Sequence, residues 1–163
     1  MPPTISARER LSASVRLLRT KKGISGDQFA RDVGISRNTL FLIENKAANA
    51  SLRTIERLAH TLGVEPASLL DSRSKLLTHA TQPGLRSALP QRAEGYLREL
   101  VASNIAHYRQ QKGLTQQALV QAAGMADGYV SLVERTAPDL GLDVLERFAQ
   151  ALHVSVRVLL ATP

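Results

Sequence analysis

Apolar residues near the start of the chain recur every three or four positions, which is the spacing of an amphipathic helix. Leu11, Val15 and Leu18 form one such stripe, and Leu17 lies beside it. The stripe ends at Lys21-Lys22-Gly23, a cationic helix end followed by a glycine that can form a left-handed cap. The pattern therefore predicts a first helix that stops at these residues.

Two short helices are predicted to follow. Ser25 and Gln28 have the spacing of a capping box, and the helix that they begin ends at Gly34. Ser36 is placed to cap the next helix, on which Leu40 faces inward.

A fourth helix is predicted between a cap at Ser51 and a glycine end at Gly63, and Pro66 suits the first position of a fifth short helix. The apolar positions of the fourth helix are Leu52, Ile55, Leu58, Ala59 and Leu62. Because no segment shows sustained strand alternation, this unit is predicted to consist of five short helices.

The chain repeats this pattern after 90 residues. Val15–Leu70 aligns with Ile105–Leu160 without a gap and with 15 identities, among them Gly34 with Gly124 and Glu44 with Glu134. One fold occurring twice explains this repetition. A solenoid is not expected, because each unit is long enough to have its own core.

The predicted organisation is two domains and a linker. Residues 1–72 form the first domain, 73–90 the linker and 91–163 the second domain. Pro83, Gly84 and Pro90 mark the linker, in which Ser74–His79 is the one candidate helical turn. A longer helix, from about Gln91 to Lys112, is expected to open the second domain.

The spacing of Ala30, Gly34 and Leu40 fits a helix-turn-helix. A small residue allows two helices to approach, a glycine can adopt the left-handed turn, and an apolar residue anchors the second helix. One face of that second helix stays exposed, and a DNA major groove about 12 Å wide admits it.

At these positions the sequence resembles the XRE family, the lambda-type repressor and Cro-like helix-turn-helix domains, over nearly all of each unit. In the first unit the resemblance rests on Arg19, Lys22-Gly23, Phe29-Ala30, Gly34-Ile35-Ser36, Leu40, Ile43-Glu44, Gly63-Val64 and Leu69-Leu70. In the second unit it rests on Lys112–Gln116, Ala123-Gly124, Val133-Glu134, Val154–Val156 and Leu159-Leu160. It implies an all-α chain of two tandem five-helix helix-turn-helix domains, and a bacterial transcription regulator.

Composition and charge further restrict the class of function that is expected. The net charge is +7, and there is no cysteine for a disulfide or a thiolate site. Residues 1–72 carry eleven Lys or Arg and seven Asp or Glu. Residues 73–96 carry four Lys or Arg and one Asp or Glu, whereas residues 97–163 carry six of each kind. The excess positive charge in the first half and the middle of the chain suits a polyanionic partner. No phosphate loop, nucleophile signature or metal-ligand spacing is present, so no enzyme activity, cofactor or metal is expected.

The resemblance assigns base reading to the start of the recognition helix. The candidates are Ser36, Arg37, Asn38, Thr39 and, one turn later, Leu42. Their chemistry agrees, because Arg can bind guanine, Asn can bind adenine, and an apolar residue such as Phe41 or Leu42 can press on a thymine methyl. An ordinary polar surface helix is the alternative.

Two further sets of residues are assigned roles. The resemblance makes Arg19 with Glu44, and Arg109 with Glu134, internal salt bridges. Phosphate contacts are expected from Lys21, Lys22, Ser25, Gln28, Lys46 and Arg53, together with helix N-termini. The family usually has Gln where this chain has Gly26, so affinity is lower or the phosphate contact passes to Ser25 or Gln28.

The second unit departs from the DNA-reading pattern. Its recognition helix begins Ala126-Asp127-Gly128-Tyr129, so an acidic residue replaces Arg37. A dimerisation or partner-binding role is favoured. Weak reading of cytosine by Asp127, with a contact from Tyr129, is the alternative.

The predicted function is a sequence-specific DNA-binding regulator, with repression favoured, that binds a pseudo-palindrome as a homodimer. Tyr96, Leu97, Leu100 and Val101 are candidates for the dimer interface, although packing within the second unit also explains them. An antitoxin-like or adaptor protein that binds a protein partner is the alternative function. No membrane segment or export signal is recognised, so a cytoplasmic, nucleoid-associated location is expected.

Overall fold

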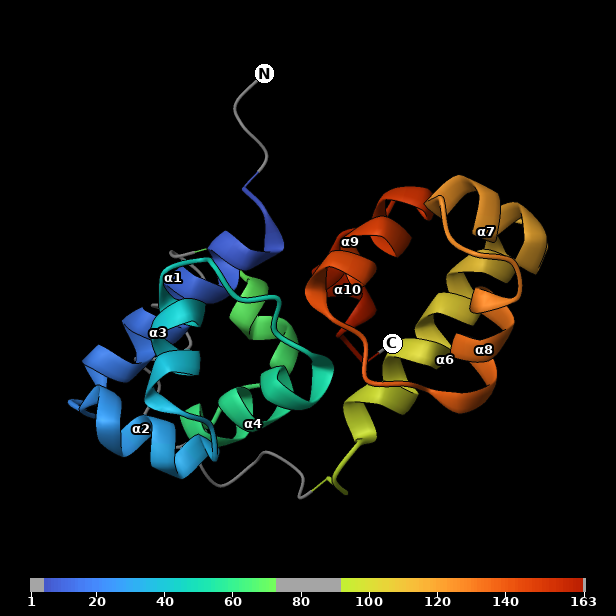
Figure 1. Cartoon of the computed structure of the whole chain (residues 1–163). Helices are drawn as coiled ribbons and strands as arrows, with labels where there is room; N and C mark the ends of the chain where they lie inside the picture. Colours follow the sequence, from blue (N-terminus) through green and yellow to red (C-terminus); the bar gives the residue numbers. More distant parts are fainter. Residues whose placement is uncertain (1–4, 73–91, 163) are drawn as a thin grey trace.

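The computed structural model describes residues 5–72 and 92–162 as two helical units that lie side by side (Figure 1). In this part of the chain the helices are joined by short turns, and the β-structure is one isolated antiparallel bridge between Ser51 and Gly141. The fold is all-α, as the sequence predicts, with a helix-turn-helix in each unit.

The first unit contains five helical elements in the predicted order. They are α1 (Ala7–Lys21), α2 (Gly26–Val33), α3 (Arg37–Glu44), α4 (Leu52–Leu62) and the 3-10 helix η1 (Pro66–Leu70). The Ser6 side chain accepts from the Glu9 amide while the Glu9 carboxylate accepts from the Ser6 amide. This complete capping box starts α1, and the sequence analysis had not identified it.

The second unit repeats this order. Its elements are α6 (Tyr96–Gln111), α7 (Gln116–Ala123), α8 (Tyr129–Thr136), α9 (Leu142–Ala151) and α10 (Val156–Leu159). The prediction that its first helix begins near Gln91 is wrong, because α6 begins at Tyr96 after Gly95, whose φ is +88°. A left-handed glycine cannot continue a right-handed helix, so the helix starts after it. The candidate turn at Ser74–His79 lies outside the described residues.

Each unit has one fully buried phenylalanine, but on different helices. Phe29 of α2 corresponds to Leu119 of α7, whereas Leu58 of α4 corresponds to Phe148 of α9, and all four side chains are 0% exposed. Because α2 packs on α4 and α7 packs on α9, the two units exchange a large and a smaller residue across the same contact. The summed side-chain volume at this pair of positions is conserved, which is the kind of change that a packed core tolerates.

Contacts between the units involve residues at the edges of the predicted linker. Asp71, close to the predicted end of the first domain at residue 72, is only 5% exposed, and its carboxylate pairs with the guanidinium of Arg157 on α10. A second ion pair between the units comes from α1, where Arg8 forms two hydrogen bonds of 2.9 and 2.5 Å with the Asp143 carboxylate.

The apolar residues considered for a homodimer interface lie against the core of the chain itself. Leu97 and Val101 are both 0% exposed, and Leu100 is partly buried against the same core. Of the two interpretations of this helix, internal packing is the one that the burial supports.

Candidate nucleic-acid interface

The recognition helix of the first unit, α3, begins with a hydroxyl cap. Ser36 Oγ accepts a hydrogen bond of 2.9 Å from the Thr39 amide and lies 2.7 Å from Thr39 Oγ1. Both hydroxyls therefore hold the first turn of α3 together, and each has only its remaining hydrogen-bonding capacity for another partner.

The outer face of α3 is open to solvent. Arg37, Asn38, Phe41 and Leu42 are all exposed, with Phe41 at 55% and Leu42 at 37%. Exposed apolar side chains next to an arginine and an asparagine match the mixed chemistry of base edges and thymine methyl groups.

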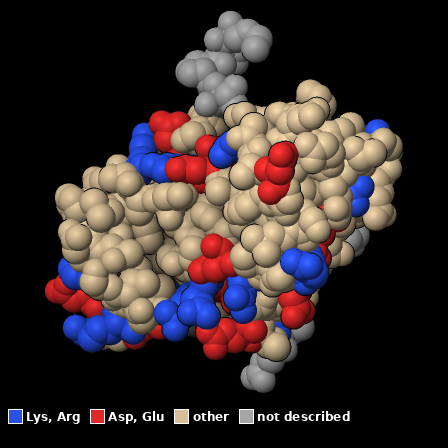
Figure 2. Space-filling model, turned by 45° about the vertical axis from the view of Figure 1, so that its right-hand side comes forward, with Lys and Arg blue, Asp and Glu red and all other residues tan. Residues whose placement is uncertain are grey.

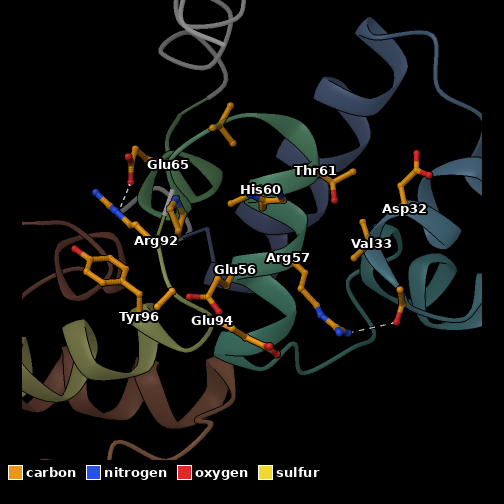
Figure 3. A pocket seen from close by; sticks show the side chains of 15 residues that line it. Asp32, Val33, Glu56, Arg57, His60, Thr61, Glu65, Arg92, Glu94 and Tyr96 are labelled. Carbon is orange, nitrogen blue, oxygen red and sulfur yellow. Dashed lines mark hydrogen bonds and ion pairs between the residues drawn. The ribbon is translucent and has the colours of Figure 1, made fainter. Parts of the chain in front are cut away.

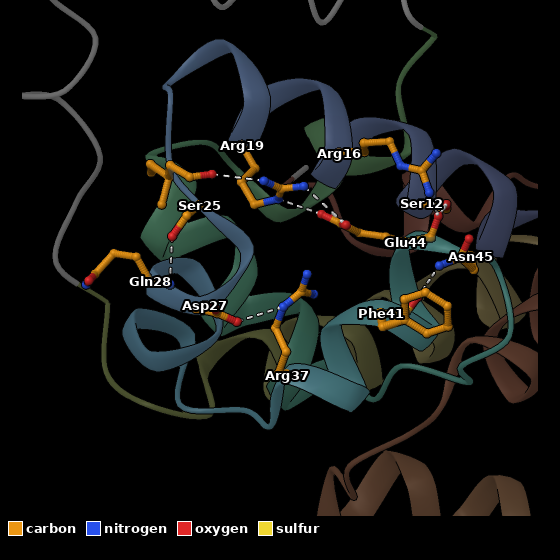
Figure 4. Close-up of polar contacts among 11 residues, drawn as sticks. Ser12, Arg16, Arg19, Ser25, Asp27, Gln28, Arg37, Phe41, Glu44 and Asn45 are labelled. Atoms are coloured by element: carbon orange, nitrogen blue, oxygen red, sulfur yellow. Dashed lines mark hydrogen bonds and ion pairs between the residues drawn. The ribbon is translucent and has the colours of Figure 1, made fainter.

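The inner face of α3 is anchored by packing and by an ion pair. Leu40 is 0% and Ile43 3% exposed. The Glu44 carboxylate accepts from Arg19 Nε at 2.7 Å and Nη2 at 3.2 Å, and Arg19 also donates to the Ile24 carbonyl (Figure 4). One arginine therefore joins α1, the turn after it and the end of α3.

Two residues that the sequence analysis did not identify complete this anchor. Ser12 Oγ and Arg16 Nη2 both donate to the Glu44 carbonyl, at 2.6 and 2.7 Å. They satisfy an otherwise unpaired carbonyl at the helix C-terminus. The 90-residue repeat offers no signal for them, because alanines stand at both equivalent positions, 102 and 106.

Arg37 reaches back from α3 to the start of α2. Its Nε lies 2.9 Å from Asp27 Oδ1, and Figure 4 shows its side chain extending towards Asp27. A Cβ added at Gly26 would lie 2.7 Å from Arg37 Cζ. Gly26 therefore leaves the space that the Arg37 guanidinium occupies.

The second unit has a glutamine at the position equivalent to Gly26. Gln116 Nε2 donates to Glu134 Oε2 at 2.8 Å. In the first unit the Arg37 guanidinium fills the corresponding region, so Gly26 and Arg37 form a matched pair. From this position the Arg37 guanidinium has the chemistry to bind either a base edge or a phosphate.

Replacing Gly26 by alanine is expected to displace Arg37 without unfolding the protein. The clash is with the far end of a flexible side chain, the surface ion pair contributes at most about 1 kcal/mol, and alanine is the better helix former by up to about 1 kcal/mol. Urea unfolding should therefore change by less than about 1 kcal/mol, while affinity for DNA falls several-fold.

Gly23→Ala is the matched control for this variant. Nothing lies within 4 Å of the added Cβ, but φ is +66°. It should lose about 1 kcal/mol of stability and keep the affinity of the folded protein for DNA. Unchanged DNA affinity in Gly26→Ala would contradict a role for the Gly26–Arg37 pair.

The remaining phosphate candidates near α2 lie on the surface. Lys21 and Lys22 are exposed at the end of α1, and Ser25 Oγ caps α2 by accepting from the Gln28 amide at 3.2 Å. The predicted capping box is only half formed, because the Gln28 side chain binds Asp32 at 2.6 Å instead of reaching back to Ser25. An i,i+4 partner on the same helix face competes for this amide group.

Lys46 and Arg53 lie away from this group. The Lys46 ammonium is 3.2 Å from the Glu9 carboxylate. Arg53 is exposed in the first turn of α4, and its amide donates to Asp139 of the second unit. On the face drawn in Figure 2, positive and negative side chains lie beside each other.

The second recognition helix starts later than the first. By equivalence with α3 it would begin at Asp127, but α8 begins at Tyr129, after Gly128 with φ +78° and no side-chain cap. Asp127 accepts from Gln117 Nε2 at 3.0 Å, and the Tyr129 ring stacks near-parallel to Phe148. The side chains at the start of α8 are thus directed to partners within the unit.

The internal ion pair of the second unit has the same geometry as that of the first. Arg109 Nε is 2.6 Å and Nη2 3.1 Å from the Glu134 carboxylate, and Nη1 donates to the Leu114 carbonyl. Burial by itself raises the pKa of Glu134. The hydrogen bonds from Arg109 and Gln116 and the arginine charge outweigh burial and hold that pKa below its ordinary value.

A further arginine supports the turn in each unit. Arg57 Nη1 donates to the Gly34 carbonyl at 3.5 Å, and Arg147 donates to the carbonyls of Ala123 and Gly124. Arg57 and Arg147 are an identity in the sequence repeat. The carbonyls that they bind are brought to them by the packing of α4 and α9 against the turns.

Among residues 5–72 and 92–162, no helix combines the length and the apolar character needed to cross a bilayer. The same residues contain no group of three or more His, Asp or Glu side chains arranged to hold a metal ion.

Comparison with protein families gives two matches. The model described as "Helix-turn-helix" matches residues 15–69, and the one described as "Helix-turn-helix domain" matches residues 101–162. These ranges contain α2–α3 and α7–α8, respectively.

Three similar proteins are described as regulators or control proteins. A "Neisseria hypothetical transcription factor" from Neisseria meningitidis serogroup B is 35% identical over 83 residues, which are 49% of this chain and 78% of that protein. The "uncharacterized HTH-type transcriptional regulator y4dJ" of Sinorhizobium fredii is 42% identical, over 41% of this chain and 86% of its own length. "Control protein C.SmaI" of Serratia marcescens is 34% identical, over 39% of this chain and 76% of its own length.

Among solved structures, the crystal structure of the hypothetical transcription factor NHTF from Neisseria is similar. It is 31% identical with a TM-score of 0.42, and the match covers 48% of this chain and 95% of that chain.

Proposed function

Because this chain belongs to the XRE-type helix-turn-helix family of DNA-binding transcription regulators, we propose that it recognises a specific double-stranded DNA sequence through α3 and represses transcription there. The observation that carries this proposal is the open outer face of α3 on a helix whose inner face and C-terminus are fixed. A base-reading helix needs both properties, because its side chains must reach the groove from a defined position.

Arg37 and Asn38 are the proposed base readers. Both are exposed in the first turn of α3, which is the part of a recognition helix that meets base edges. In the free protein Arg37 is held by Asp27 with side chains 53% and 70% exposed. A surface pair of this kind contributes at most about 1 kcal/mol, so Arg37 can exchange Asp27 for a guanine at little cost. Because Gly26 has no side chain, the guanidinium keeps its position beside the start of α2 when it does so.

The phosphate contacts proposed around α3 come from Lys21, Lys22, Ser25 and Gln28, with Lys46 and Arg53 further away. Phosphate contacts fix the orientation of the protein on the duplex and carry no sequence information. The amides at the start of α2 add to them, because a helix N-terminus favours an anion.

Selection of bound sequences from a random DNA pool tests this proposal. We expect the full chain to enrich a defined motif, and an Arg37→Ala/Asn38→Ala double variant to lose it. Each single change should weaken binding to the selected site by about 1–3 kcal/mol, or 5- to 150-fold, with little loss on random DNA.

Lys21→Ala provides the matched control. It should weaken binding to selected and random DNA equally and lower the slope of the salt dependence by about one unit. Equal losses on both DNAs for Arg37→Ala would identify Arg37 as a phosphate contact. Absence of any enriched motif would overturn the proposal and favour a protein partner.

A further inference from the structure

The two units contact each other through equivalent positions of the repeat. Ser51 and Gly141, which are 90 residues apart, form the antiparallel bridge. The Leu52 amide donates to the Leu140 carbonyl at 2.9 Å, and in return the Leu142 amide donates to the Ala50 carbonyl at 3.0 Å. Exchanging the two units leaves this pair of hydrogen bonds unchanged.

A second pair of contacts has the same symmetry. Asn49 Oδ1 accepts from the Asp143 amide at 3.1 Å, and Asp139 Oδ1 accepts from the Arg53 amide at 2.9 Å. Each unit therefore caps the N-terminus of the other unit's fourth helix. Positions 49 and 139 correspond in the repeat, as do positions 53 and 143.

A third pair lies further from the bridge. Glu56 of α4 accepts from the Leu97 amide at 3.0 Å, and Glu146 of α9 accepts from the Ala7 amide at 2.6 Å. Each carboxylate binds the positive N-terminus of the other unit's first helix. Positions 56 and 146 again correspond, and so do 7 and 97.

Further interactions lie around the contact between Glu56 and the start of α6. Glu56 also accepts from the Gly95 amide at 3.1 Å, and Arg92 pairs with Glu65 at 2.9 Å while lying 4.4 Å from the centre of the Tyr96 ring. The side chains of Glu56, Glu65, Arg92 and Tyr96 line a pocket of about 460 Å³ between the units (Figure 3).

The reciprocal contacts define a local two-fold axis between the bridge residues. Two-fold symmetry with self-complementary contacts is the arrangement of a homodimer, but here both halves belong to one chain. A two-fold axis also carries α3 onto α8, so both helices stand at the same height along it. Two adjacent turns of a major groove require this arrangement.

We propose that the chain binds DNA as a single-chain pseudo-dimer, in which α3 reads one half-site and α8 sits over a neighbouring half-site without reading it. The operator is then asymmetric, and one chain occupies it. This inference rests on the proposed function. It replaces the expected homodimer on a pseudo-palindrome, since the two-fold contact is already made within the chain.

The start of α8 explains why the second half-site is not read. Asp127 is bound to Gln117, Gly128 has no side chain, and the Tyr129 ring lies on Phe148. An acidic side chain at this position is also repelled by the phosphate-rich groove.

The test measures the mass of the wild-type complex with its selected duplex by analytical ultracentrifugation. We expect one chain per duplex and a motif with a single defined half. Two chains on an inverted repeat would overturn the pseudo-dimer and leave the proposed function standing. No enriched motif at all would overturn the proposed function, and this inference with it.

A converted second unit gives an independent result. Gln116→Gly/Ala126→Ser/Asp127→Arg/Gly128→Asn introduces the cap, the base readers and the space that the first unit has. One chain of this variant should bind an inverted repeat of the wild-type half-motif at least tenfold more tightly than the wild type does. Equal affinity in a folded variant would contradict the placement of α8. The wild-type mass decides the proposal even where the variant does not fold.

Discussion

Replacing Leu40 by alanine is expected to lower the free energy of unfolding by about 2–5 kcal/mol, and with it the affinity for specific DNA. Leu40 is 0% exposed on the inner face of α3. Truncating a buried leucine removes its transfer free energy and leaves a cavity. Because the same side chain fixes α3 on the core, the base-reading face also loses its defined position.

Phe41→Ala is the control for this prediction, since Phe41 is the next residue on α3 and is 55% exposed. Its stability in urea should stay within about 0.5 kcal/mol of the wild type. Affinity for DNA should fall in Phe41→Ala only if the ring contacts a base. A loss of stability as large as that of Leu40→Ala would show that α3 packs differently from the structure described above.

Replacing Arg109 by alanine is expected to destabilise the second unit by about 3 kcal/mol at pH 7. The Arg109 and Glu134 side chains are each 12% exposed, and removing one partner of a buried pair leaves an uncompensated charge. Gln116, which donates one hydrogen bond to Glu134, would be its remaining side-chain partner among the contacts described above.

The destabilisation should depend on pH. The pKa of Glu134 is lowered in the folded protein, so the pair contributes its full stability above the unfolded-state pKa of about 4.3 and loses it as pH falls through the lower folded value. The difference between wild type and Arg109→Ala should therefore shrink between pH 5 and acid pH.

Arg135→Ala on the exposed face of α8 serves as the control and should stay within about 0.5 kcal/mol of the wild type at every pH. A difference for Arg109→Ala that stays constant from pH 7 to acid pH would contradict the assignment to the Glu134 carboxylate.

The helix boundaries of the first unit follow from local chemistry, which explains why the sequence predicted them. Ser25, Ser36 and Ser51 cap three helices, and Gly34 and Gly63 end two of them with φ near +70°. A cap or a left-handed glycine acts within one turn of the chain, so its signal is local. The start of α6 was predicted wrongly because periodicity alone does not reveal that Gly95 is left-handed.

The candidate site was predictable as a set of residues but not as a set of contacts. The position of Arg37 at the start of a recognition helix follows from the pattern. Its approach to Asp27 and its dependence on Gly26 arise because α2 and α3 cross. The same holds for Ser12 and Arg16, which lie more than 25 residues from the carbonyl that they bind.

By itself, the sequence determined that the chain is helical, that it contains one fold twice, and that the first copy carries the side chains suited to DNA. Periodicity and caps depend on residues within a few positions of each other, and the repeat is found by comparing the chain with itself. Only the tertiary structure decided how the two copies meet, because that contact is built from backbone groups and from polar side chains that carry no pairing signal in the sequence. Glu56 and Glu146 look like any other identity in the repeat, and their shared role exists only once each lies at the start of the other unit's first helix.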